Sequence, residues 1–209
     1  MSSVIATDVT SARRTRRPAA ETRQHVLDVA EQLFYWQGIH ATGIDRIVVE
    51  AGIAPTTLYR LFRSKDELVA AYVDRYAEGY RAWIESITSD QHQAARERII
   101  AVFDGLASNT GPGVFRGCPF LMALAEYPDA GSAAHASAQA VKAWVRDKLR
   151  ELAGQLPDVS PAAARTLGDQ LALIVEGLYA STAALGTHGP ASQAHALAAL
   201  VIDNHAPVR

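Results

Sequence analysis

A glycine between two short apolar patterns constrains the fold of this chain most strongly, and it lies in the segment VVEAGIAPTTLYRLFRSKDEL, residues 48–68. The apolar residues before it are spaced as on one helix face: Ile44, Ile47, Val48 and Ala51. A second apolar face follows within a few residues: Leu58, Leu61 and Phe62. Because Gly52 can adopt the left-handed conformation that ends a helix, we expect two short helices joined by a tight turn. Thr56 or Thr57 is placed to cap the second helix.

The remaining segments carry helical patterns as well. An apolar stripe between Thr22 and Gly38 predicts a first helix, and a capping box of Ser64 and Glu67 predicts a long helix that runs to about residue 88. Further helices are predicted over residues 91–107, 119–127, 132–153, 162–185 and 192–204. Ser160 and Pro161 form a cap and first-turn pair before the fourth of these. No window alternates with period two for long, so we expect an all-α fold of about nine helices.

Composition fits a globular protein with a substantial core, since 49% of the 209 residues are hydrophobic and 20% are charged. The N-terminal sequence has no apolar run of the kind found in secretory signals, and the run LALIV is far shorter than the roughly 20 residues of a membrane span. The single cysteine, Cys118, excludes an internal disulfide and a cysteine-cluster metal site. These features predict a cytoplasmic protein without a membrane partner.

Charge is distributed unevenly although the net charge is only −2. Residues 1–65 carry nine basic and six acidic residues, whereas the rest of the chain is net acidic. Four arginines lie in RRTRR, which we interpret as part of a disordered basic arm over residues 1–19. Such an arm either aids solubility alone or reaches toward phosphates or a minor groove.

Two short helices joined at Gly52, with the first helix behind them, match the helix-turn-helix layout, whose second helix enters the DNA major groove. If the apolar face points inward, the polar side chains on the second helix point outward: Thr56, Thr57, Tyr59, Arg60 and Arg63. Hydroxyl and guanidinium groups bind base edges and phosphates, and Lys65 adds charge at the next helix start. The alternative is an ordinary helical hairpin with a polar outer face.

Residues from about 20 to 68, and above all GIHATGIDRIVVEAGIAPTTLYRLFRSKDEL, resemble the amino-terminal domain of the tetracycline-repressor (TetR) family of transcriptional regulators. The resemblance rests on several features in register: AT before the second helix, AG at the turn, then TLYRLF and SKDEL. It implies a DNA-binding domain at residues 20–66 and an effector-binding and dimerisation domain at residues 67–209. It also implies a homodimer that a small molecule releases from a palindromic double-stranded DNA operator.

By matched position, the resemblance gives Thr42 and Lys65 phosphate contacts and Tyr59 a backbone contact, and it places Thr56, Thr57 and Arg60 in the groove. Two departures affect the second helix. Gly43 stands where the family usually has a capping Ser or Thr, which would leave the cap to Thr42. Asp45 and Arg46 invert the usual basic-then-acidic order, so base readout from this helix is in question.

The last two predicted helices carry long apolar faces that we interpret, mostly from the resemblance, as the dimer interface, although they suit an intrachain core equally well. The predicted interface residues are Leu167, Leu171, Ile174, Leu178, Thr182, Leu197, Leu200 and Val201. An operator-binding dimer is expected because one helix-turn-helix unit reads too few base pairs to find a genomic site.

Aromatic and sulfur-containing side chains between these ends could line an apolar effector cavity or simply form core. The candidate ligand-binding residues are Trp83, Phe103, Phe115, Cys118, Met122, Tyr127 and Trp144. Cys118 precedes a predicted helix start and follows Arg116 by two residues. It is therefore either an inert packed thiol or the thiol of a redox or electrophile sensor.

No catalytic, metal or cofactor motif is present. The seven histidines do not pair at metal-ligand spacing, and phosphate loops, dinucleotide fingerprints and nucleophile elbows are missing. We therefore expect a ligand-responsive DNA-binding regulator, most simply a repressor, and no enzyme, metal or cofactor. Two alternatives remain: a thiol-based sensor acting through Cys118, and a helical small-molecule-binding protein without DNA binding.

Overall fold

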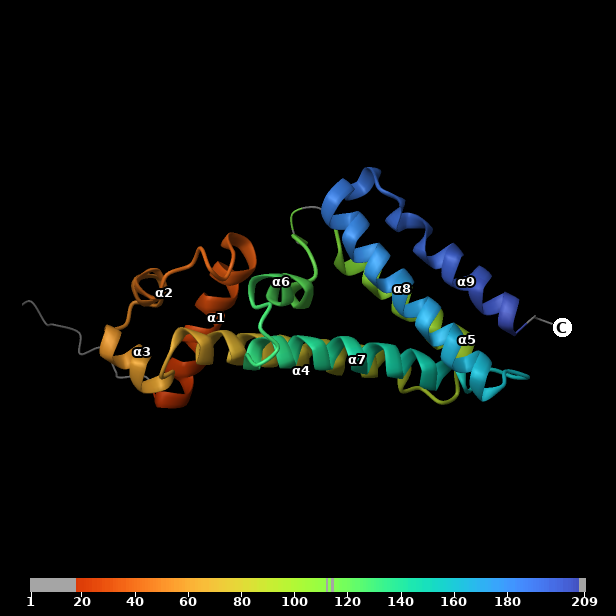
Figure 1. Cartoon of the computed structure of the whole chain (residues 1–209), viewed down its shortest axis with the longest axis horizontal. Coiled ribbons are helices and arrows are strands. Elements are labelled where there is room, and N and C mark those ends of the chain that lie inside the picture. Colours follow the sequence, from red (N-terminus) through yellow and green to blue (C-terminus); the bar gives the residue numbers. More distant parts are fainter. Residues whose placement is uncertain (1–17, 112, 114, 207–209) are drawn as a thin grey trace, which may run out of the picture.

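The chain folds into an elongated bundle, and every regular element in the part described by this computed structural model, residues 18–111, 113 and 115–206, is helical (Figure 1). This confirms the predicted all-α fold class. The α-helices are α1 (Ala19–Gln37), α2 (Ile44–Ala51), α3 (Pro55–Leu61), α4 (Lys65–Thr88), α5 (Ala95–Asn109), α6 (Pro119–Glu126), α7 (Ala133–Ala153), α8 (Pro161–Leu185) and α9 (Ala194–His205). Two 3₁₀ helices that were not predicted, Gly186–His188 and Pro190–Gln193, connect α8 to α9. The predicted basic arm lies almost entirely outside the described residues.

Helices α1 to α3 form a small three-helix unit at one end of the molecule (Figure 1). Gly52 ends α2 in the left-handed conformation, with φ 62° and ψ 37°, as its position predicted. Leu58 of α3 and Phe62 after it are fully buried. The predicted cap was wrong, because α3 begins at Pro55 and no side chain caps it. Pro55 sets the helical φ of the first turn and has no N–H group that needs a cap.

The start of α4 follows the predicted capping box closely. The Ser64 hydroxyl accepts a hydrogen bond from the backbone N–H of Glu67 at 3.1 Å. In return, the Glu67 carboxylate accepts from the backbone N–H of Arg63 at 2.8 Å, one residue before the usual partner. Helix α4 then runs without a break from the three-helix unit into the larger bundle (Figure 1). The proposed domain boundary at residue 66 therefore falls inside a continuous helix, which belongs to both parts.

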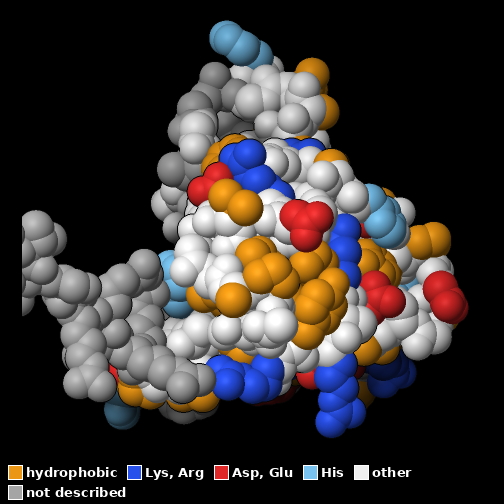
Figure 2. Space-filling view, turned by 90° about the vertical axis from the view of Figure 1, so that its left-hand side faces the viewer, with side chains coloured by type: hydrophobic (Ala, Val, Ile, Leu, Met, Phe, Trp, Pro, Cys, Tyr) orange, Lys and Arg blue, Asp and Glu red, His pale blue; other side chains and the backbone are white. Residues whose placement is uncertain are grey.

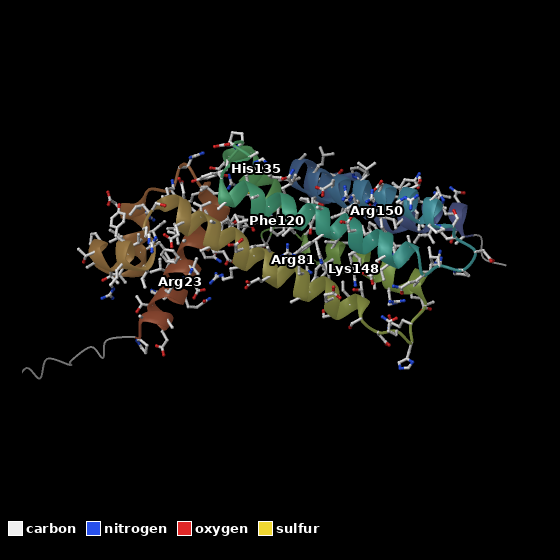
Figure 3. The ribbon with its side chains drawn as sticks, turned by 60° about the horizontal axis from the view of Figure 1, so that its bottom comes forward. Arg23, Arg81, Phe120, His135, Lys148 and Arg150 are labelled. Carbon is white, nitrogen blue, oxygen red and sulfur yellow. The ribbon has the colours of Figure 1, made fainter. Side chains whose placement is uncertain are left out.

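Helices α4 and α7 lie side by side and run in the same direction. Three contacts between them join residues that are 63 positions apart: Ser137 donates to Asp74, Arg81 lies 5.9 Å from the Trp144 ring centroid, and Lys148 lies 3.3 Å from the Glu85 carboxylate. A constant separation along both helices is the signature of a parallel pair. Figure 3 shows Arg81 and Lys148 along the line where the two helices meet.

Helix α8 packs against α7 in the opposite direction and at close range. Lys142 pairs with Glu176 at 2.8 Å. Later in α7 and earlier in α8, Arg150 pairs with Asp169 at 2.8 Å. Gly168 faces the α7 backbone, where an added Cβ would lie 2.7 Å from the Arg150 Cα atom. The missing side chain of Gly168 therefore sets the distance between α7 and α8.

Replacing Gly168 with alanine is expected to destabilise the protein by about 1 to 3 kcal/mol, because the new methyl group overlaps backbone that cannot rotate away. The matched control is Gly79→Ala in α4, where a Cβ meets nothing within 4 Å. That change is expected to stabilise the helix by about 1 kcal/mol. Urea unfolding followed by circular dichroism measures both values. Equal stability of the two variants would contradict the close packing at Gly168.

Within the described residues, no helix combines the length and the apolar character that crossing a bilayer requires.

Candidate nucleic-acid interface and effector cavity

The outer side of α3 carries polar side chains while its inner side is buried. Thr56, Tyr59 and Arg60 are exposed, with 53% of Tyr59 accessible, and Arg63 is exposed just beyond the helix. Thr57 and Lys65 are half-buried. The division follows from Leu58 and Phe62, which anchor the other side of α3 in the core and so turn the polar side outward.

The arginines around α3 differ in their partners. Arg60 and Arg63 form no side-chain ion pair within the described residues, so their guanidinium groups are available to an external anion. Arg46 of α2 is paired with Glu50 at 2.6 Å, and Arg23 of α1 lies 4.8 Å from the Phe62 ring centroid. Figure 2 looks onto this end of the molecule and shows Lys and Arg side chains along its lower edge below a hydrophobic centre. Unpaired cations therefore gather at α3.

The structure does not support a phosphate contact from the Thr42 side chain. Thr42 is only 1% exposed, and its hydroxyl donates to the backbone carbonyl of Gly38 at 2.8 Å and lies 3.3 Å from that of Leu33. The hydroxyl therefore ties the α1–α2 loop to the end of α1. It does not cap α2 either, since the N-cap is Gly43 and no side chain accepts there.

A cluster of hydrogen bonds, here called the domain junction, joins the three-helix unit to α6. The Glu126 carboxylate accepts from the backbone N–H groups of Ile39 at 2.9 Å and His40 at 2.6 Å. The His40 ring stacks on Tyr127 with centroids 5.2 Å apart, and the Tyr127 hydroxyl donates to Asp66 at 3.0 Å. The last turn of α6 therefore holds both the α1–α2 loop and the start of α4.

The other end of α6 is also tied to α1. The Tyr35 hydroxyl donates to the Gly117 carbonyl at 3.1 Å and accepts from the Arg116 backbone N–H at 2.7 Å. The Arg116 guanidinium donates to the Tyr35 carbonyl at 2.6 Å. Both ends of this eight-residue helix thus contact the three-helix unit.

A cavity of about 310 Å³, here called the aromatic cavity, opens next to the first turn of α6. Its lining residues come from α4, α5, α6, α8 and the segment before α6: Tyr76, Tyr80, Trp83, Leu106, Asn109, Thr110, Phe115, Cys118, Pro119, Phe120 and Tyr179. Of the predicted ligand-binding residues, Trp83, Phe115 and Cys118 are among them. The volume lies at the lower end of the range for small-molecule sites.

The other four predicted ligand residues lie elsewhere. Phe103 is buried in the core at 1% exposure, Tyr127 belongs to the domain junction, and Trp144 faces Arg81 between α4 and α7. Met122 approaches Gly117 but does not line the aromatic cavity. Aromatic content alone could not separate these positions. The spacing of Tyr76, Tyr80 and Trp83 on one face of α4 was the available signal for the tyrosines that were missed.

The tyrosines of the aromatic cavity stay protonated at neutral pH. Burial raises the pKa of Tyr76 to about 12 and holds the pKa of Tyr80 and Tyr179 further above the ordinary value. The Tyr179 hydroxyl donates to that of Tyr80 at 3.1 Å. Phe115 stacks on Tyr179 with centroids 5.5 Å apart, and Phe120 forms T-shaped contacts with Tyr76 and Tyr80.

Cys118 is only 4% exposed and forms the N-cap position of α6. The neighbouring guanidinium of Arg116 is directed to the carbonyl of Tyr35. Cys118 is a buried free cysteine and one of the residues that line the aromatic cavity.

The predicted interface residues on α8 and α9 fall into two groups that differ in burial. Leu167 and Leu171 are buried inside the chain, so their assignment to a surface was wrong, whereas Leu178 is buried but lines a groove between α8 and α9. Ile174, Thr182 and Val201 are half-buried, and Leu197 and Leu200 are exposed. The structure adds Leu173, which is 71% exposed on α8.

Leu173 and Leu197 border a shallow apolar groove between α8 and α9, here called the α8–α9 face. It is lined by Leu173, Ile174, Gly177, Leu178, Ser181, Pro190, Ala191, Gln193, Ala194 and Leu197. In the described residues, no group of three or more His, Cys, Asp or Glu side chains is arranged to hold a metal ion.

Several known proteins are similar to this chain in sequence. Residues 26–72 match the family model described as bacterial regulatory proteins, tetR family. The HTH-type transcriptional activator FasR of Mycolicibacterium smegmatis is 36% identical over 96 residues, which span 44% of this chain and 43% of FasR. The chain thus matches less than half of that relative's length. The regulator YjdC of Escherichia coli is 24% identical over 84% of this chain and 91% of YjdC.

A solved structure extends the similarity to nearly the whole chain. The crystal structure of a TetR-family transcriptional regulator from Streptomyces coelicolor superposes with a TM-score of 0.83. The two proteins are 32% identical, and the alignment covers 90% of this chain and 97% of the other. Similarity of this extent includes the helices of the larger bundle as well as the three-helix unit. The chain belongs to the TetR family of transcriptional regulators.

Proposed function

We propose that this protein acts as a homodimer on a palindromic DNA operator, and that a small molecule in the aromatic cavity releases it, so that it represses transcription. The observation that carries this proposal is the surface of α3. Its exposed side chains include a hydroxyl, a phenol and the unpaired guanidinium of Arg60, while Leu58 fixes the helix from behind. These groups bind base edges and phosphates in a major groove.

Dimerisation supplies the second recognition helix that a specific operator needs. The α8–α9 face is the best candidate surface, because Leu173 and Leu197 are exposed and line the same apolar groove. Helices α8 and α9 lie away from α3 in the molecule (Figure 1). Contiguous exposed apolar surface of this kind is typical of protein interfaces. A two-fold dimer presents two α3 helices, and operators for such dimers carry half-sites about 34 to 36 Å apart or a multiple of that.

Two helices are placed to link the aromatic cavity to α3. Helix α4 lines the cavity through Tyr76, Tyr80 and Trp83, and its first residue, Lys65, follows α3 closely. Helix α6 lines the cavity through its first turn and holds the α1–α2 loop through Glu126 in its last turn. A ligand that shifts the start of α6 therefore moves the domain junction. A coupling free energy of about 1 to 3 kcal/mol would change operator affinity about 5- to 150-fold.

Selection of bound duplexes from a random pool tests the proposed function. We expect enrichment of a palindrome, with an affinity that falls steeply as salt rises because phosphate contacts release counterions. Purified full-length protein at moderate ionic strength is the material for this experiment. Failure to enrich any duplex would refute operator binding. Transcription from a promoter carrying the selected site, with and without the protein, then gives the sign of regulation.

Glu126→Gln is expected to loosen the domain junction without unfolding the protein. The amide has one acceptor oxygen in place of two, and its NH₂ group faces a backbone N–H. Loss of a charge-assisted hydrogen bond of about 1.5 to 3 kcal/mol should speed hydrogen exchange at Ile39 and His40 about 10- to 150-fold. Exchange measured by mass spectrometry on residues 38–43 checks this.

The matched control for this prediction is Glu78→Gln, an exposed carboxylate of α4 without a hydrogen bond in the described part of the chain. It should leave exchange in the α1–α2 loop unchanged. If both variants exchange like the wild type, the Glu126 clamp does not hold the loop.

A further inference from the structure

We infer that the aromatic cavity selects an uncharged, flat aromatic ligand that carries a hydrogen-bond acceptor. The role of this ligand as an effector rests on the function proposed above, but its chemical class follows from the cavity itself. Three properties of the lining lead to it: the rings, the missing charges and the unused phenol protons.

Aromatic rings dominate the walls. Six of the eleven lining residues are aromatic, and they come from α4, α6, α8 and the segment before α6. Phe115 and Tyr179 stack with an interplanar angle of 20°, whereas Phe120 stands edge-on to Tyr80 at 62°. Figure 3 shows Phe120 between the start of α7 and α4. A flat ring system can meet faces and edges of this kind by stacking and by edge-to-face contact, each favourable beyond area burial alone.

The lining contains no Lys, Arg, His, Asp or Glu. Lys142 lies close to one wall, with its Nζ 5.5 Å from the Tyr179 ring centroid. Its charge is already matched, because Nζ also donates to both oxygens of Glu176 at 2.8 and 2.9 Å. A buried carboxylate or ammonium group on a ligand would thus find no counter-charge, and burying an unpaired charge is costly. The cavity therefore disfavours both acids and organic cations.

The phenol O–H groups leave hydrogen-bond donors free for an acceptor on a ligand. The Tyr80 and Tyr179 hydroxyls together hold two protons, and the hydrogen bond between them uses one. The Tyr76 hydroxyl has no hydrogen bond to any described residue. Because burial raises the pKa of these phenols, they remain donors at neutral pH. A neutral acceptor such as a ketone or ether oxygen is the complementary group.

Four flat probes that differ in one substituent test this inference on the full-length protein. They are 2-acetylnaphthalene, its acceptor-free analogue 2-isopropenylnaphthalene, 2-naphthoate and 2-naphthamidinium. Titration calorimetry without DNA is expected to show the ketone binding about 3- to 10-fold more tightly than the alkene, the worth of one hydrogen bond. Naphthoate and the amidinium should bind at least about a hundredfold more weakly than the ketone.

Three outcomes would overturn the inference: a charged probe that binds as tightly as the ketone, equal affinity for ketone and alkene, or no ketone binding up to its solubility limit. The triple variant Tyr76→Phe, Tyr80→Phe, Tyr179→Phe removes every phenol donor of the lining and should reduce the preference for ketone over alkene toward unity. Tyr72→Phe is the matched control. Tyr72 is a buried tyrosine of α4, one turn before Tyr76 and two turns before Tyr80, and it does not line the cavity. It should keep the preference of the wild type.

The test is independent of operator binding. A ketone that binds as expected but does not change the affinity for a selected duplex would leave the ligand class standing and refute effector control. Conversely, a protein that binds an operator but none of the probes would keep its DNA-binding function and lose this inference.

Discussion

Arg60→Ala is expected to lower the affinity for a selected operator by about 30-fold to more than 10,000-fold. A guanidinium bonded to base edges contributes about 1 to 3 kcal/mol, and a dimer makes the contact in both half-sites. Arg60 is exposed on α3 and has no ion pair within the described residues, so its guanidinium group is available to DNA. Fluorescence anisotropy at one fixed salt concentration measures the loss.

Arg165→Ala is the matched control, because it removes the same charge from an exposed position on α8, far from α3. Its operator affinity should stay within a few-fold of the wild type. Circular dichroism confirms that both variants are folded. If Arg60→Ala binds the operator as well as Arg165→Ala does, α3 is not the reading helix and the proposed interface is wrong.

The proposed dimer predicts that the double variant Leu173→Glu, Leu197→Glu is a monomer at concentrations where the wild-type dimer forms. Both leucines are exposed at the α8–α9 face, so the charges leave the folded monomer intact. In a dimer the same glutamates would be buried without partners, which costs several kcal/mol per charge and should raise the dissociation constant at least about a thousandfold. Sedimentation velocity distinguishes the two states, and operator affinity should fall with dimer formation.

Val49→Glu is the control for dimerisation, since Val49 is 74% exposed on α2 at the other end of the chain. It should remain dimeric. A double variant that still sediments as a dimer would move the interface away from α8 and α9. Leu178→Glu would not be an informative choice, because Leu178 is in the core and its replacement would unfold the subunit.

Local signals predicted most of the helices and several of their ends. Gly52 ends α2 because a residue without a Cβ adopts the left-handed conformation without strain, and Ser64 begins α4 because its hydroxyl satisfies a free N–H group. Ser160 caps α8 for the same reason. The cap expected at Thr56 or Thr57 was wrong because Pro55 already starts α3.

Side-chain surroundings were harder to predict than helices. Helix α8 is apolar on most of its circumference, so periodicity could not distinguish Leu171, which faces its own core, from Leu173, which faces solvent. Thr42 looked like a surface residue beside Gly43, but the return of the chain from α1 to α2 buries its hydroxyl against backbone carbonyls. Such positions depend on which neighbours the packed helices bring near.

The sequence by itself determined the helix-turn-helix unit, because its turn, caps and apolar spacing act within a few residues of one another. Only the tertiary structure decided that Tyr80 of α4 meets Tyr179 of α8, and that Glu126 of α6 holds the backbone of Ile39. Those contacts join residues 99 and 87 positions apart. No local pattern encodes them, since they arise only when long helices pack at fixed distances, as Gly168 permits for α7 and α8.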